Sequence, residues 1–181
     1  MLPAHAEDHG IANTVAVSRP YYLEIDKSER LLRVKFAGET YREYHIASGR
    51  GGSGAKRQLG DKRTPEGIYR IVDINASSEF HLFLRLNYPN VNDAFTGLKN
   101  SIISNAEFNR IIESLIFGKL PPQDTALGGA IGIHGVGVET ADKLKIHSNL
   151  DWTKGCVALT NDEVSELRQL VSIGTEVVIQ E

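Results

Sequence analysis

A cysteine and a histidine are the residues of this sequence whose types and spacing could perform covalent chemistry. Cys156 is the only cysteine among 181 residues, so it cannot form an internal disulfide or a metal site built from cysteines alone. Gly155 precedes it and permits a tight turn whose backbone N–H groups could stabilise an oxyanion, and His134 could act as a general base. The pattern favours a nucleophilic thiol. A buried packing residue and an intermolecular bridge are the alternatives.

Four segments of the sequence, taken together, resemble a known enzyme family. They are Ser48-Gly49 with Thr64-Pro65-Glu66-Gly67-Ile68-Tyr69-Arg70-Ile71, Leu86-Asn87-Tyr88-Pro89-Asn90 with Asp151-Trp152-Thr153, His134-Gly135, and Thr153-Lys154-Gly155-Cys156-Val157. In order and content they are similar to the L,D-transpeptidase (YkuD-type) catalytic domain. The second segment points to its murein L,D-transpeptidase subfamily. The resemblance spans residues 22 to 159 and implies a β-rich mixed sandwich with an inserted helix and a further helix after the cysteine.

This resemblance also implies a reaction. The Cys156 thiol would attack the carbonyl of the third stem-peptide residue of peptidoglycan, meso-diaminopimelate, D-alanine would leave, and the acyl group would pass to an amine. A diaminopimelate acceptor gives a crosslink and a lysine acceptor anchors a protein, so a wall-anchored lipoprotein is an implied partner beside the stem peptides. Water as acceptor would make the enzyme an L,D-carboxypeptidase or an amidase that releases wall-linked protein. An inactive wall-binding module is the alternative from a different class.

Individual residues receive roles from the same resemblance. His134 would accept the thiol proton, and the carbonyl of Gly135 would orient its ring. The backbone N–H groups of Lys154, Gly155 and Cys156 would form the oxyanion hole. The side chains expected to contact substrate are those of Lys154, Thr153, Trp152, Tyr69 and Tyr88.

Two positions depart from the family pattern. Lys154 stands where many members carry a second histidine; its charge could support a thiolate, but a lysine does not relay protons near neutral pH. Ala158 stands where many members carry an arginine, so a side chain that could bind a substrate carboxylate is missing at this position. His147 could compensate, although a surface loop position is the better expectation for it. A zinc site from His134, His147 and Cys156 lacks a second cysteine or a close histidine pair and is not favoured.

Composition limits the class of protein. Hydrophobic residues make up 41% and charged residues 24%, as in an ordinary globular domain, and a net charge of −3 gives no electrostatic case for nucleic acid. No apolar run approaches the roughly 18 residues of a membrane span. We therefore expect one catalytic domain at residues 21–181, with no cofactor and no metal.

The first 20 residues are predicted to be a flexible tail that ends at Pro20. Ala4-His5-Ala6 has the small-x-small pattern of a signal-peptidase site, without the apolar stretch that should precede it. A remnant of a signal peptide and a chance tripeptide both fit. An exported, periplasmic or envelope location therefore depends mainly on the family resemblance.

Hydrophobic periodicity predicts an α+β domain. The expected strands lie at residues 22–26, 31–36, 40–46, 68–74, 80–86 and 175–179, with a further strand leading into His134. Capping boxes at Ser104 and Thr160 predict two helices, the first inside an insertion at about 90–130. In the strand at 80–86, His81, Phe83 and Arg85 are expected on the face opposite the apolar one, and His81 is expected to be structural or solvent-facing rather than catalytic. The Gly-rich stretch 49–60 lacks a phosphate-binding motif and is expected to be a loop.

Overall fold

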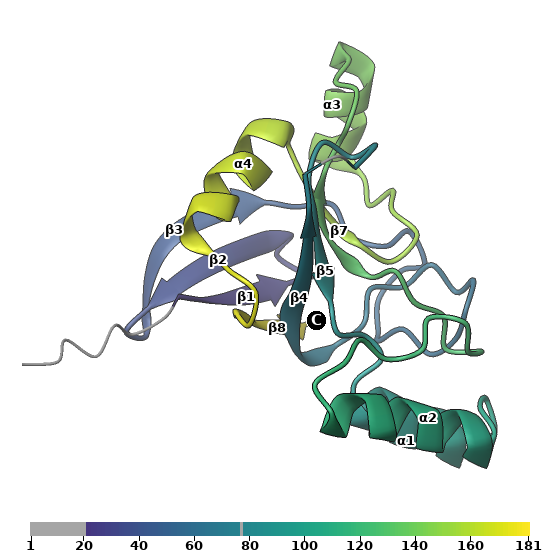
Figure 1. Cartoon of the computed structure of the whole chain (residues 1–181). Coiled ribbons are helices and arrows are strands. Elements are labelled where there is room, and N and C mark those ends of the chain that lie inside the picture. Colours follow the sequence, from purple (N-terminus) through teal and green to yellow (C-terminus); the bar gives the residue numbers. More distant parts are fainter. Residues whose placement is uncertain (1–20, 77) are drawn as a thin grey trace, which may run out of the picture.

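The structure is a computed structural model and describes residues 21–76 and 78–181. It contains one eight-stranded sheet in the order β3-β2-β1-β8-β4-β5-β6-β7 (Figure 1). The strands are β1 (Tyr22–Asp26), β2 (Leu31–Phe36), β3 (Glu39–His45), β4 (Gly67–Asn75), β5 (Phe83–Leu86), β6 (Gly132–Gly135), β7 (Val157–Leu159) and β8 (Glu176–Gln180). The expected tail at residues 1–20 lies outside the described residues.

The sheet is mixed and bends until its two edges meet. β1 and β8 pair in parallel, as do β6 and β7, while the other neighbours are antiparallel. Just beyond β3, Ala47 exchanges two backbone hydrogen bonds with Ala158 of β7, at 3.1 and 2.8 Å. The sheet is therefore nearly a closed barrel, and the expected α+β class is confirmed.

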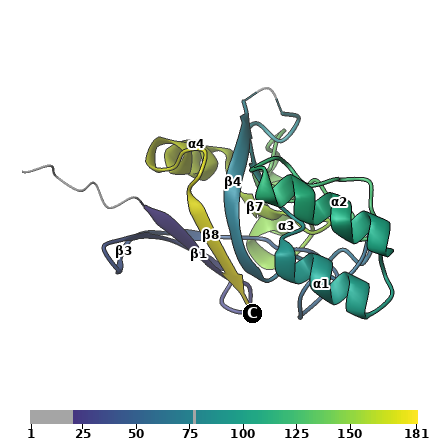
Figure 2. The ribbon, with the colours of Figure 1, turned by 60° about the horizontal axis from the view of Figure 1, so that its bottom comes forward.

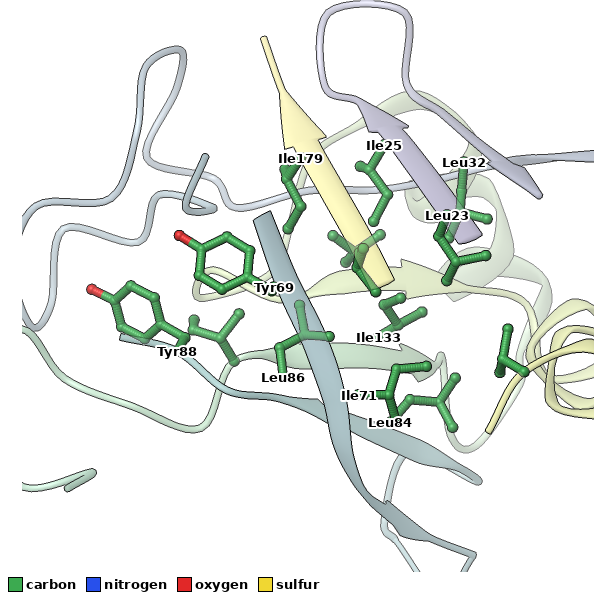
Figure 3. Close-up of a cluster of buried hydrophobic side chains, with 14 of the residues drawn as sticks. Leu23, Ile25, Leu32, Tyr69, Ile71, Leu84, Leu86, Tyr88, Ile133 and Ile179 are labelled. Carbon is green, nitrogen blue, oxygen red and sulfur yellow. The ribbon is translucent and has the colours of Figure 1, made fainter. Parts of the chain in front are cut away.

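The interior is filled by side chains from both halves of the sheet. Leu23 and Ile25 of β1 face inward and alternate with partly exposed neighbours, which is the period-two pattern of a half-buried strand. Figure 3 shows these side chains meeting Leu84 and Ile133 from the opposite half. This packing produces the sandwich-like core that the sequence resemblance implies.

Strand β5 is shorter than predicted. It begins at Phe83 rather than at residue 80, because His81 adopts a positive φ of 71° in the turn before it. The alternation from Leu82 onward is as expected, since Leu84 and Leu86 lie in the core. His81 is exposed, as predicted, and its Nε2 lies 2.9 Å from Ser165 Oγ. The opposite face carries Phe83 and Arg85.

The predicted insertion contains two helices rather than one. Ser104 and Glu107 form the expected capping box of α2 (Asn105–Ile116). A second capping box, formed by Asn90 and Asp93, opens α1 (Val91–Lys99), which the sequence analysis did not identify. The two helices lie side by side at one end of the molecule (Figures 1 and 2).

Two further helices lie away from the insertion (Figure 1). α4 (Asn161–Leu170) begins at the predicted capping box of Thr160 and Glu163 and buries Val164 and Leu167. α3 (Ala141–Asn149), capped by Thr140, was not predicted because most of its residues are polar. Within the described parts of the chain, no helix is long and apolar enough to cross a membrane.

Candidate active site

Cys156 and His134 line the same cleft, which has a volume of about 980 Å³. Both come from the edge of the sheet where β6 and β7 run in parallel, with His134 beside Ala158 in the register. The cleft is lined by Arg50, Lys56, Leu59, Gly60, Lys62, Asn75, Ser78, Glu79, Phe80, Phe83, Arg85, Gly129, Ala130, Ile131, His134, Trp152, Thr153, Lys154 and Cys156. The two residues that the sequence singled out thus share one cavity.

The Cys156 thiol is partly exposed at this cleft and is contacted by backbone groups of the chain before β6. Its Sγ donates to the carbonyl of Ala130 at 3.4 Å and accepts a hydrogen bond from the backbone N–H of Gly132. Burial raises the pKa of Cys156 to about 11, and the Gly132 N–H offsets this only in part. The resting Cys156 side chain is therefore a neutral thiol, which would need a base to act as a nucleophile.

His134 is held in one tautomer. Its Nδ1 lies 2.7 Å from the carbonyl oxygen of Gly135, and because a carbonyl can only accept, Nδ1 carries the proton. Nε2 is therefore left as the basic nitrogen. Gly135 is required here, since a Cβ at this position would approach Asn161 Oδ1 at 2.5 Å. The structure has the hydrogen bond that the resemblance implied.

Aromatic rings enclose the imidazole. The ring centres of Phe80 and Phe83 lie 4.3 and 5.9 Å from the centre of the His134 ring, and the Phe83 ring is nearly parallel to it. The Trp152 ring is edge-on to His134, with 6.0 Å between the ring centres. His134 is 2% exposed. This burial, with the positive charge of Lys143, lowers the pKa of His134, so the ring is neutral and able to accept a proton near neutral pH.

The turn before Cys156 is ordered by Thr153. Its hydroxyl donates to the carbonyl of Cys156 at 2.7 Å and accepts from the N–H of Gly155 at 3.1 Å. Gly155 has a φ of 131°, and a Cβ there would lie 2.8 Å from the carbonyl oxygen of Arg63. The Gly155 N–H, one of the three donors expected for an oxyanion hole, is therefore already engaged with Thr153. Thr153 itself is buried and shapes the turn.

The side chains of Lys154 and Trp152 line the cleft as expected. Lys154 is exposed, and the cations whose charge acts on the Cys156 thiol are Arg85 and Lys56. Trp152 is partly buried, and its indole N–H points to Nδ1 of His147 at 3.4 Å.

His147 is not the surface loop residue that the sequence suggested. It lies in α3, is 3% exposed, and burial lowers its pKa. The prediction failed because α3 was not recognised as a helix. His147 supports the far side of Trp152 rather than the thiol.

Tyr69 and Tyr88 do not line the cleft, which corrects their assignment as substrate-binding residues. Both are fully buried at one end of the core (Figure 3). The Tyr69 hydroxyl donates to Asp93 at 2.9 Å, and the Tyr88 hydroxyl donates to the carbonyl of Leu127 at 3.0 Å. These two tyrosines join the sheet to the helical insertion.

Sequence reasoning missed the positive lining of the cleft. Five cationic side chains and one carboxylate line it, those of Arg50, Lys56, Lys62, Arg85, Lys154 and Glu79. The alternation of β5 already placed Phe83 and Arg85 on one face, but it did not show that this face borders the cysteine. In the part of the chain that the structure describes, no cluster of His, Cys, Asp and Glu side chains could hold a metal ion.

Comparisons with known proteins agree with this geometry. The family model of the L,D-transpeptidase catalytic domain, YkuD, matches residues 20–179. The L,D-transpeptidase homologue YafK of Escherichia coli strain K12 is 30% identical over 90 residues, which cover 46% of this chain and 37% of YafK.

Solved structures share the fold at lower identity. The helical cell shape determining protein Pgp2 from Campylobacter jejuni superposes with a TM-score of 0.56 at 22% identity, over 90% of this chain and 48% of that one. Bd1075 of Bdellovibrio bacteriovorus gives 0.54 at 22% identity, over 93% and 50% of the two chains. An L,D-transpeptidase from Mycobacterium smegmatis gives 0.51 at 12% identity, over 89% and 58%.

This chain therefore spans about half the length of these structures and 37% of YafK. The family match covers almost all of the described residues, and it includes the sheet, the cleft, Cys156 and His134. The chain belongs to the L,D-transpeptidase (YkuD-type) catalytic domain family.

Proposed function

We propose that this protein catalyses cysteine-dependent acyl transfer on peptidoglycan stem peptides. The observation that carries the proposal is the pairing of a partly exposed Cys156 thiol with a buried His134 in one cleft, where Gly135 fixes the histidine tautomer. A neutral thiol with a pKa of about 11 in the same cleft as a neutral imidazole is the starting state for general-base activation. The positive lining of the cleft suits a peptide that carries carboxylates.

In the first half-reaction, Cys156 Sγ attacks the carbonyl carbon of diaminopimelate while its proton passes to Nε2 of His134. The backbone N–H groups of Lys154 and Cys156 donate to the oxygen that becomes negative. The carbon–nitrogen bond to D-alanine then breaks, and His134 returns the proton to the leaving amine. A thioester on Cys156 remains, and the histidine is neutral again.

In the second half-reaction, an amine attacks the thioester and gives a proton to His134, which passes it to the departing sulfur. A diaminopimelate side chain as acceptor yields a crosslink, and a lysine of an envelope protein yields a wall-anchored protein. Water in the same position yields a shortened stem peptide. The site would thus act in the cell envelope, where peptidoglycan lies.

The test is to incubate the protein with a purified disaccharide-tetrapeptide and to identify the products by mass spectrometry. Crosslinked dimers with release of D-alanine are the expected products. Tripeptides without dimers would mean that water attacks the same acyl-enzyme and that the protein is an L,D-carboxypeptidase. Unchanged substrate, under conditions in which Cys156 is alkylated by iodoacetamide, would contradict the proposal and favour a binding module.

A further inference from the structure

Arg85 is a cation of the cleft that the acyl-transfer steps above do not use. Its side chain lines the cleft together with Cys156 and is 28% exposed. In the β5–β6 register Arg85 is opposite Gly132, whose N–H is the group that hydrogen-bonds the Cys156 sulfur. Arg85 is therefore one strand away from the backbone that contacts the nucleophile.

The guanidinium of Arg85 is positioned by packing and has unused donors. Its Cζ lies 5.5 Å from the centre of the Phe83 ring. Its ion pair with Asp73 on β4 is long, with Nε 3.8 Å from Oδ2, and the Asp73 side chain is largely exposed. Across residues 21–76 and 78–181, its terminal Nη atoms form no hydrogen bond. A planar group of this kind can bind a carboxylate with two parallel hydrogen bonds.

The other cations of the cleft are less suited to this task. The ammonium of Lys56 is buried and already contacts Asp61 and the carbonyl of Gln58, at 2.9 and 2.8 Å. Arg50, Lys62 and Lys154 are exposed to solvent, where a charge is screened. Arg85 therefore combines partial burial, a fixed position and free donors.

The position of Arg85 indicates which carboxylate it meets. Phe83, over which the guanidinium lies, is the register partner of His134 and stacks on its ring. Arg85 and His134 thus both lie against the Phe83 ring, and the leaving amine must lie near His134 to receive its proton. In a departing α-amino acid, the carboxylate is attached to the carbon that bears this amine.

We propose that Arg85 binds the terminal carboxylate of the departing amino acid and makes the cleft selective for stem peptides that end in a free carboxylate. This inference rests on the proposed function. Ala158, two residues after Cys156, cannot do the same, because its side chain is an uncharged methyl group without a donor and is fully buried. Arg85 is therefore assigned as a specificity-determining residue and not as a participant in proton transfer.

The experiment compares two substrates and three proteins. The substrates are a disaccharide-tetrapeptide ending in D-alanine and the same compound ending in D-alaninamide. The proteins are the wild type, Arg85→Met, and Arg42→Met as a control, since Arg42 lies on β3 and pairs with Glu166 outside the cleft. The measured quantity is the ratio of kcat/KM for the acid to that for the amide, so differences in intrinsic leaving-group reactivity cancel between proteins.

The wild type and Arg42→Met are expected to share one ratio, and Arg85→Met is expected to lower it by about tenfold to a hundredfold. Circular dichroism checks that Arg85→Met is folded, and any effect of the lost charge on the Cys156 thiol acts on both substrates and cancels in the ratio. An unchanged ratio in Arg85→Met would overturn the assignment and leave the proposed function standing. Failure of the wild type to turn over either substrate would instead remove the proposed function, and this inference with it.

Discussion

The indole N–H of Trp152 is directed at Nδ1 of His147, with 3.4 Å between the nitrogens, and the Trp152 ring also lies edge-on to the ring of His134. His147 lies in the last turn of α3, and the guanidinium of Arg30 donates to the backbone carbonyl of His147 at 3.0 Å. A buried histidine in α3 thus supports the aromatic wall against which the proposed general base packs.

His147→Ala is therefore expected to destabilise the protein. The substitution removes a buried ring and leaves the Trp152 N–H without its acceptor, so the free energy of unfolding should fall by about 1–3 kcal/mol. Urea denaturation measures it. His81→Ala is the control, because His81 is exposed, and its effect should stay within about 0.5 kcal/mol. Equal stabilities for the two variants would contradict the assigned support.

Cys156→Ala should abolish turnover and covalent labelling by a carbapenem-type β-lactam, with the fold intact. His134→Ala should slow acylation by at least about a hundredfold if the ring is the general base. Stopped-flow measurement of acylation, with circular dichroism to confirm folding, checks both. If the acylation rate of His134→Ala falls by less than tenfold, His134 is not the general base.

The pH dependence of kcat/KM should reflect the burial of His134. His134 accepts a proton only when neutral, and burial lowers its pKa, so the neutral form persists to lower pH than usual. The acid limb of kcat/KM should therefore lie below pH 6.5, the ordinary histidine value. Direct titration of the Cys156 thiol by its ultraviolet absorbance should give a midpoint near 11. An acid limb above 6.5 would show that another group controls activity.

Gly155→Ala should lose activity and stability together. The φ of 131° is strained for alanine, and the new methyl group would meet the Arg63 carbonyl at 2.8 Å. Gly38→Ala separates the backbone strain from the steric clash, since Gly38 has a φ of 90° but a Cβ added there would have no atom within 4 Å. We expect a cost of about 1–3 kcal/mol for Gly38→Ala with normal turnover. The cost should be larger for Gly155→Ala, with turnover lost.

Lys154→Met tests whether an exposed ammonium beside the nucleophile affects the thiol. The charges that act on Cys156 come from Arg85 and Lys56, so iodoacetamide rates plotted against pH should superimpose for the wild type and Lys154→Met. The backbone N–H of residue 154 survives the substitution, and oxyanion stabilisation should persist with it. A tenfold slower alkylation of Lys154→Met at pH 6 to 7 would restore the electrostatic support that the sequence suggested for Lys154.

Much of this arrangement could be predicted from the sequence because local patterns determine it. The meander of β1 to β3, the helix after Thr160 and the final strand follow from periodicity and capping residues. His147 was misplaced because the polar α3 was not recognised as a helix. Tyr69 and Tyr88 were misplaced because their burial depends on contacts between distant segments, with Asp93 and Leu127 respectively. No local pattern reports such contacts. The role of Arg85 was hidden for the same reason.

The reciprocal backbone hydrogen bonds between Ala47 and Ala158 limit how the proposed stem-peptide substrate could bind. An unpaired strand edge can recruit an extended peptide as an additional strand. The outer edge of β7 is already paired at Ala158, two residues from the nucleophile. A bound peptide therefore cannot extend the sheet at this position. In the proposed function, recognition of the peptide would depend on the turn at Thr153 to Cys156 and on the charged side chains of the cleft rather than on backbone pairing at this edge.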